Sequence, residues 1–281
     1  MRRLCLVALA ISIVLPALAQ YSADKPLGAS AQSAPAYLKN AGLDQRLGTQ
    51  IPLNLHFKDS TGADAPLGRY FGRKPVALAL VYYKCAMLCP QVLHGLANSL
   101  AQTGYASARD YDVIVASIDP SDTPADAEGA RQKFVAQIGG DVPRDSVHFL
   151  TGAQPEITAL AESIGFHYVR VPGPDGKMTQ FAHSSVIMVA TPEGKLSKYL
   201  TGVEYQPRDL RLALLEASDH RIGSPSDLIL LYCCNYSPGE GRYTVSVLRV
   251  LGLAGMGSVF GLVALLYMLN RKPKMKTIAS A

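Results

Sequence analysis

Two cysteines four positions apart are the residues of this sequence best placed to do chemistry. Cys85 and Cys89 lie where an apolar run, residues 75–83, gives way to apolar residues at helical spacing that begin at Pro90. Free backbone N–H groups and the positive end of a helix dipole stabilise a thiolate, the form that attacks disulfides or binds metal. The pair is therefore a candidate for redox exchange or soft-metal binding. A static disulfide or two buried thiols is the structural alternative in an exported chain.

A third ligand would decide between these uses of the thiols. Two thiolates suit Cu(I), and an imidazole would complete a three-coordinate site, whereas zinc usually takes four ligands. His183 precedes an expected core strand and could reach the thiols from a loop, while His94, five residues beyond Cys89 on the same expected helix, is the local rival. Because a lone histidine is more often a hydrogen-bonded structural residue, spacing alone leaves the choice open.

Strand-like and helix-like segments alternate along the middle of the chain. The strand-like runs are apolar and rich in strand formers, and the helical segments open at proline or a capping residue and end near glycine. We expect strands at 75–83, 112–118, 148–151, 166–171, 185–190 and 196–200, and helices near 90–104, 123–140, 155–164 and 207–218. This order, which closes with a hairpin and a helix, predicts an α/β sandwich of the thioredoxin kind.

The two ends of the chain carry topology signals. A short basic start, an apolar run and the small residues at 17–19 predict a signal peptide over 1–19, although an uncleaved start could remain as a second anchor. Residues 250–270 carry no charge, which predicts a C-terminal transmembrane helix over 247–270, and the basic tail at 271–281 should face the cytoplasm. The expected localisation is the inner (plasma) membrane, with the soluble domain in the periplasm or outside.

The remaining residues divide into a flexible leader (20–42), one folded domain (43–222) and a juxtamembrane segment (223–246). The formal charge of +5 comes mostly from the two ends, and residues 20–270 carry about −1. No basic stripe with interleaved aromatics is present, so nucleic acid is not an expected partner. Cys233 and Cys234, just before the membrane segment, leave membrane-side copper binding, a disulfide to a partner and plain burial open.

Residues 43–215 resemble the Sco family of copper chaperones for cytochrome oxidase assembly. The matching motifs are Val81-Tyr82-Tyr83-Lys84-Cys85 running into Cys89-Pro90, Ser117-Ile118-Asp119-Pro120 followed by Asp122-Thr123-Pro124, Phe149-Leu150-Thr151-Gly152, Gly165-Phe166 and Phe181-Ala182-His183. The resemblance implies that copper, as Cu(I) with Cu(II) left open, is bound by Cys85, Cys89 and His183. It also places the family's acidic position near the metal at Asp119, which would hold a ligand or a nearby cation by hydrogen bonding.

The resemblance implies a membrane-anchored copper chaperone that delivers copper to the dinuclear copper centre of a cytochrome c oxidase. Its partners would be the copper-bearing oxidase subunit and a copper donor or thiol reductant. The alternative is a thiol–disulfide reductase that keeps the oxidase cysteines reduced; only this function would make the protein an enzyme. A thiol peroxidase is disfavoured because the usual Pro-x-x-x-Thr-x-x-Cys arrangement is missing around Cys85.

Two positions leave room for other interpretations. The family usually has proline directly after its first cysteine, and here that residue is Ala86, which adds a backbone N–H and frees the loop slightly. From the sequence alone, Asp119 is better explained as a turn residue before a helix cap, and both roles can coexist.

Overall fold

The computed structural model describes residues 40–85, 89–140, 142–173, 176–219, 226, 230–232 and 234–270. The predicted signal peptide and basic tail lie outside the described residues, as do residues 20–39 of the leader and Cys233. The elements below belong to the second of the chain's two units, residues 41–281.

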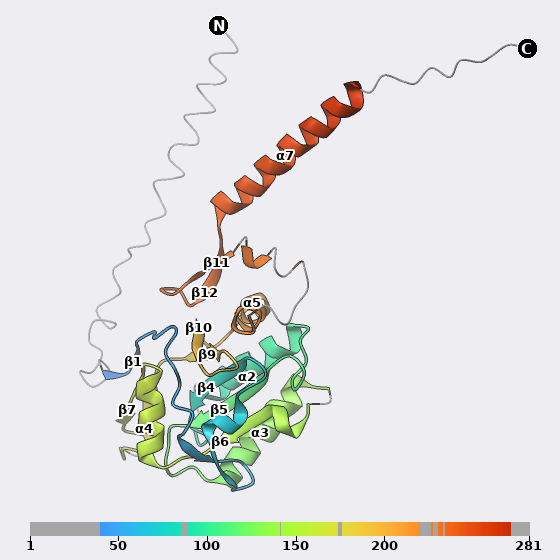
Figure 1. The fold of residues 1–281 in the computed structure, drawn as a ribbon. Helices are drawn as coiled ribbons and strands as arrows, with labels where there is room; N and C mark the ends of the chain where they lie inside the picture. Colours follow the sequence, from blue (N-terminus) through green and yellow to red (C-terminus); the bar gives the residue numbers. More distant parts are fainter. Residues whose placement is uncertain are drawn as a thin grey trace, which may run out of the picture. The chain divides into compact units, whose positions relative to one another are not determined.

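A five-stranded sheet forms the centre of the domain (Figure 1), in the order β10-β9-β4-β5-β6. β4 runs parallel to β5 and β5 to β6, whereas β9 pairs antiparallel with both β4 and β10. All six residues of β4 are buried, as its continuous apolar sequence predicts. The strand bounds are β4 Val76–Val81, β5 Asp112–Ser117, β6 Val147–Leu150, β9 Val186–Ala190 and β10 Leu196–Thr201.

Three helices lie beside this sheet: α2 (Cys89–Gln102), α3 (Pro124–Ile138) and α5 (Pro207–Ala217). α2 contacts both of the others. Thr123 caps α3 with a capping box, in which its side chain accepts from the backbone N–H of Asp126 and the Asp126 carboxylate accepts in return. Each helix follows a strand of the central sheet, which confirms the predicted thioredoxin-like α/β sandwich.

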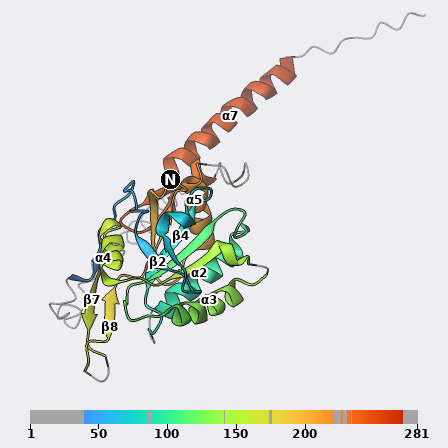
Figure 2. The same cartoon turned by 60° about the horizontal axis from the view of Figure 1, so that its bottom comes forward.

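A second, three-stranded sheet carries His183. It has the order β1-β7-β8, with β1 (Gly42–Leu43), β7 (Phe166–Val171) and β8 (Gln180–His183), and Figure 2 shows β7 and β8 side by side as a hairpin. The prediction that His183 lies on a loop is therefore wrong, because it is the last residue of β8. α4 (Gln154–Ser163) packs on β7, and β2 (His56–Lys58) and β3 (Asp64–Pro66) form a short separate hairpin.

The juxtamembrane segment contains a β-ribbon of β11 (Cys234–Ser237) and β12 (Arg242–Val245). The Tyr236 hydroxyl bonds to the backbone of Tyr199 on β10, and the Tyr243 hydroxyl lies 2.9 Å from Glu216 Oε2 on α5. Cys234 is buried, in line with the burial alternative for this cysteine. The ribbon is thus attached to β10 and α5 of the folded domain by its own tyrosine side chains.

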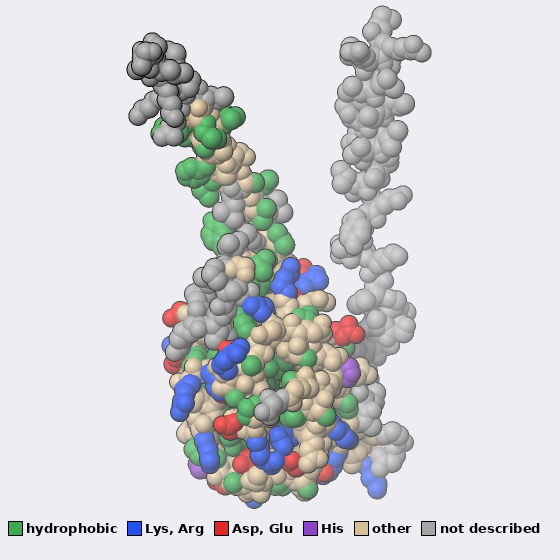
Figure 3. Space-filling model, turned by 90° about the vertical axis from the view of Figure 1, so that its right-hand side faces the viewer, with side chains coloured by type: hydrophobic (Ala, Val, Ile, Leu, Met, Phe, Trp, Pro, Cys, Tyr) green, Lys and Arg blue, Asp and Glu red, His purple; other side chains and the backbone are tan. Residues whose placement is uncertain are grey.

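One helix among the described residues is long and apolar enough to cross a membrane. It is α7 (Val247–Asn270), whose span Val250–Met268 meets that test of length and composition. Figure 3 shows hydrophobic side chains along this helix, whereas lysine, arginine, aspartate and glutamate are intermixed over the domain surface.

Candidate functional site

Sheet register brings residues far apart in the sequence to the same place. β4 ends just before the thiols, and β9 runs antiparallel beside it, with Ala79 opposite Ile187 and Val76 opposite Ala190. The start of β9 therefore lies at the carboxyl end of β4, and the residues that precede β9 lie near the residues that follow β4. His183 precedes β9, so it is delivered to the thiols by the pairing of two buried strands.

His183 and Cys89 are in direct contact. The Cys89 sulfur lies 3.4 Å from His183 Nε2, and His183 Nδ1 lies 2.9 Å from the backbone oxygen of Ser184. Because a carbonyl oxygen only accepts, the proton belongs on Nδ1, and Nε2 presents its lone pair to the thiol. The His183 ring also packs on Phe166, with centroids 5.3 Å apart. Ser184 thus fixes the tautomer in which Nε2 can bind a metal.

Cys85 occupies the turn between β4 and α2 and is half-buried, whereas Cys89, the first residue of α2, is buried. Residues 86–88 between them lie outside the described residues. In the described part of the chain, no three histidine, cysteine or acidic side chains are already gathered as a metal-binding group. The structure therefore brings Cys89 and His183 together and puts Cys85 beside them, but does not gather the three predicted ligands around one point.

The buried side of this site favours the neutral form of each titratable group. The pKa of the Cys89 thiol is raised by a hydrogen bond with Cys85 and then by burial, which together outweigh hydrogen bonds from backbone N–H groups. The expectation that the helix start favours a thiolate at Cys89 is therefore wrong. Burial lowers the pKa of His183, so this imidazole is neutral. Burial, followed by a hydrogen bond with Cys85, raises the pKa of the Tyr82 hydroxyl.

The other described histidines have partners elsewhere. His94, the local rival, has Nδ1 3.1 Å from Asn98 Nδ2, and the Asn98 side-chain oxygen accepts from Gln137. Since that second bond orients the Asn98 amide, His94 Nδ1 is an acceptor and Nε2 carries the proton. His56 and His167 pair with aspartates, and the His148 ring packs on Tyr70. Among the described histidines, His183 is thus the one whose lone pair faces a thiol.

A hollow of about 530 Å³ opens beside both thiols. Its walls come from α2 and α3 and include Leu93, His94, Ala130 and Phe134. The pair can therefore be reached by a partner's side chain from the α2–α3 side.

Asp119 is buried in the turn after β5. Its Oδ1 accepts from the backbone N–H of Ser121 at 2.9 Å, and its own N–H donates to Ser117 Oγ. These are the contacts of a turn residue, and the hydrogen bonds of the described residues do not link Asp119 to either thiol or to His183. A role beside the metal stays a prediction.

Sequence reasoning missed a different aspartate in the same turn. Asp122 Oδ2 accepts from the backbone N–H of Tyr83 at 2.7 Å, two residues before Cys85. Asp122 belongs to a motif that carries the family resemblance, Asp122-Thr123-Pro124, and the sequence explains it there as part of a turn and helix cap. The available signal was its place after a parallel strand next to β4, since the carboxyl ends of parallel neighbours meet at one sheet edge.

The structure is a thioredoxin-like sandwich with two thiols at a strand-to-helix junction, one of them against a neutral imidazole. Residues 55–216 match the SCO1/SenC family model, which covers more than half of the chain, and the protein belongs to this family. A comparison with curated protein sequences gave no match.

Solved structures support the same fold. A crystal structure from Aquifex aeolicus VF5, of a protein assigned to electron transfer, is similar with a TM-score of 0.54 and 24% identity, covering 63% of this chain and 96% of that one. Arabidopsis thaliana ScoI, crystallised with copper bound, is similar with a TM-score of 0.50 and 20% identity, covering 59% of this chain and 97% of that one.

Proposed function

We propose that this protein binds copper through Cys85, Cys89 and His183 and delivers it to the dinuclear copper centre of a cytochrome c oxidase. The observation that carries the proposal is the contact between Cys89 Sγ and the unprotonated Nε2 of His183. A thiolate and an imidazole are donors that suit Cu(I), and the second thiol would complete a three-coordinate set. Membership of the SCO1/SenC family supports the assignment, as does the copper bound to the Arabidopsis relative.

The distance between the two donor atoms fits a shared ion. Donor atoms 3.4 Å apart are close enough to bind one ion together, because two metal–ligand bonds of about 2 Å each span more than that distance. Copper would replace the proton that Cys89 holds, so binding releases protons and weakens as the pH falls. Cys85 would join from its turn, where it is half-buried.

We propose further that α7 anchors the protein in the inner membrane, with the domain in the periplasm. Support comes from the span Val250–Met268 and from the basic residues that follow it in the sequence. A fixed orientation would keep the thiols on the side where an oxidase exposes its copper subunit.

Thiol–disulfide exchange at Cys85 and Cys89 is the second candidate. It is favoured by the hydrogen bond between the two thiols and by the hollow that reaches them. His183 separates the two functions, because copper binding needs its lone pair and thiol exchange does not.

The test is Cu(I) titration of the reduced full-length protein in detergent against a competing chelator. We expect one Cu(I) per chain, lost in the double variant Cys85→Ser, Cys89→Ser and weakened by at least about tenfold in His183→Ala. His94→Ala is the matched control, since its ring lines the same hollow with Nδ1 already engaged, and it should bind as the wild type does.

Stoichiometric binding that survives in the double cysteine variant would contradict the proposal. Complementation of oxidase assembly then separates the two functions. If His183→Ala abolishes assembly but retains thiol exchange with glutathione, copper handling is the function; if assembly is unchanged, the reductase is.

A further inference from the structure

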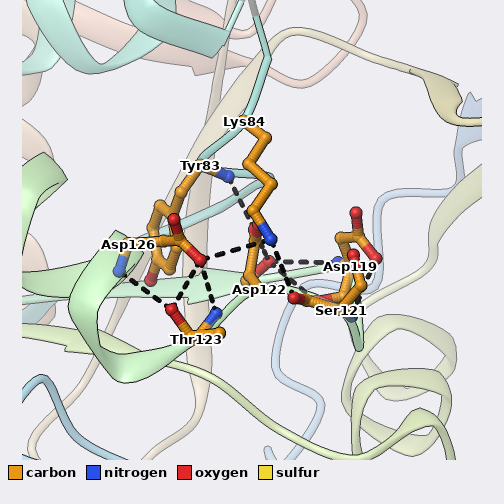
Figure 4. Close-up of polar contacts among 8 residues, drawn as sticks. Tyr83, Lys84, Asp119, Ser121, Asp122, Thr123 and Asp126 are labelled. Atoms are coloured by element: carbon orange, nitrogen blue, oxygen red, sulfur yellow. Dashed lines mark hydrogen bonds and ion pairs between the residues drawn. The ribbon is translucent and has the colours of Figure 1, made fainter.

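The turn that leads into Cys85 is held from the segment after β5 (Figure 4). Asp122 Oδ2 accepts two hydrogen bonds, from the backbone N–H of Tyr83 at 2.7 Å and from Ser117 Oγ at 2.6 Å. The Asp122 side chain is fully buried. The residue two positions before Cys85 is thus fixed to a neighbouring strand end by a carboxylate.

Lys84, the residue directly before Cys85, is attached to the same segment. Its ammonium group donates to the backbone oxygen of Ser121 at 2.8 Å and lies 3.3 Å from Asp126 Oδ2 and 3.6 Å from Asp122 Oδ1. Figure 4 shows the Lys84 side chain reaching toward Ser121, Asp122 and Asp126. Lys84 remains half-exposed, so its contacts hold the turn without contributing to the core.

Tyr83 is also fixed at its other end. Its hydroxyl lies 2.9 Å from the backbone oxygen of Val115 on β5 and 2.8 Å from that of Leu150 on β6. Since its backbone N–H is bonded to the turn after β5 and its hydroxyl contacts β5 and β6, Tyr83 cannot shift without breaking these contacts. The position of Cys85 is therefore set by β5 and its following turn as well as by β4.

A charge at position 122 needs an explanation. Burying a carboxylate is unfavourable unless it is paired and hydrogen-bonded, and a neutral asparagine could accept from Tyr83 without burying a charge. Asp122 Oδ1 makes no hydrogen bond to any described residue, and Lys84 is the cation beside it. The charge is explained if the carboxylate holds both the backbone of Tyr83 and the side chain of Lys84.

We propose that Asp122 is a positioning residue for the thiol pair: it fixes the two residues ahead of Cys85 so that this thiol faces Cys89 and His183. The inference rests on the proposed role of the thiol pair but does not require copper to be its ligand. It gives to Asp122 the supporting role that the family resemblance gives to Asp119, whose hydrogen bonds stay within its own turn.

The test is the equilibrium between dithiol and disulfide at Cys85 and Cys89 in the full-length protein. Samples are equilibrated in glutathione buffers, the thiols are trapped by alkylation, and the peptide that holds both cysteines is quantified by mass spectrometry. The contacts of Asp122 and Lys84 are present with both cysteines as thiols. Closing a disulfide would draw the two sulfurs to about 2.05 Å and pull the turn against these contacts, so weakening the contacts should favour the disulfide. We expect a shift of about fivefold in Asp122→Asn, which keeps the acceptor but loses the charge.

The matched control is Asp112→Asn. Asp112 is a mostly buried aspartate paired with Lys74 at 2.7 Å, but it begins β5, at the opposite end of the strand. This variant should change the equilibrium by less than about 1.5-fold, although it too loses a buried pair. An unchanged equilibrium in folded Asp122→Asn, an equal shift in Asp112→Asn or a shift toward the dithiol would each overturn the proposal.

Lys84→Gln keeps the test decisive if Asp122→Asn does not fold. This exposed residue can be replaced without disturbing the core, and we expect a shift of about threefold in the same direction; no shift would overturn the proposal. Cu(I) affinity, measured on the same variants, should fall in the same order. If the wild-type protein binds no copper, the proposed function fails, whereas the glutathione equilibrium still decides the role of Asp122.

Discussion

His148 makes the stability of the domain depend on pH in a direction that can be worked out from its environment. It is the second residue of β6, and its ring packs on Tyr70 with centroids 4.4 Å apart. Burial lowers the pKa of His148 to about 4, from an ordinary value of about 6.5. Because the unfolded chain then binds the proton more readily, this stabilisation is complete above pH 6.5 and is lost as the pH falls toward 4.

The size of the effect follows from the two pKa values. At pH 5 the unfolded histidine, whose pKa lies about 1.5 units above the pH, binds a proton that the folded histidine mostly does not bind. This difference lowers the free energy of unfolding by about 2 kcal/mol, at about 1.36 kcal/mol per pKa unit. For a domain of this size, that lowers the melting temperature by about 4 to 8 °C. His148→Gln removes the titrating group, so its melting temperature should fall by that much less than the wild type's between pH 7.5 and pH 5.

The measurement is thermal unfolding of the full-length protein in detergent, followed by far-ultraviolet circular dichroism at both pH values. His56→Gln is the control, since His56 is exposed and pairs with Asp64 on the surface. Its pH response should match the wild type's. A His148→Gln protein that loses as much stability as the wild type between pH 7.5 and pH 5 would refute the assignment of a buried, neutral histidine at this position.

Two further substitutions, each with a control variant, test packing elsewhere in the domain. Gly95→Ala should lower the melting temperature by about 5 °C or more, because a Cβ on Gly95 of α2 would overlap the Val203 carbonyl oxygen. The control Gly129→Ala, on α3 with open space around the position, should raise the melting temperature slightly. Tyr243→Phe should destabilise by about 1 kcal/mol in thermal unfolding, because Glu216 Oε2 on α5 loses the hydroxyl that joins it to the ribbon. A change no larger than that of Arg242→Gln, which breaks an exposed pair, would show that this hydrogen bond adds no stability.

The central elements could be predicted from sequence because their signals are local. The apolar run at 75–83 predicts β4, and the pair Thr123-Pro124 predicts the start of α3, where the structure has a capping box. These features depend on neighbours within a few residues, where spacing and side-chain type carry the information. Their bounds differ from the predicted ones by a few residues at most.

The elements that complete the site lack such signals. β8 has only four residues and mixes polar with apolar side chains, so its sequence does not predict a strand. For this reason the sequence predicts a loop at His183. The ribbon of β11 and β12 was missed because its stability depends on Tyr236 and Tyr243 reaching residues of the domain far away in sequence. Tertiary pairing, rather than local preference, decides both.

The pKa of Cys89 shows the same limit in the site itself. A cysteine at a helix start is expected to ionise easily, and that expectation uses only local geometry. The structure adds burial and a hydrogen bond with Cys85, and these raise the pKa instead. The ionisation of a thiol therefore follows from how deeply the fold places it, which spacing does not reveal.

The three proposed ligands are held in two different ways, and this bears on how a bound ion would be passed on. Cys89 and His183 sit on a helix start and a strand end, are packed against the core, and are in contact. Cys85 lies half-buried on a turn whose fixed points are Asp122 and Lys84. If copper is the cargo, an incoming ligand would displace Cys85 more easily than the other two, because Cys85 lies half-buried on a turn, whereas Cys89 and His183 lie on a helix and a strand and contact each other. The variants at position 122 therefore probe the step at which transfer would begin.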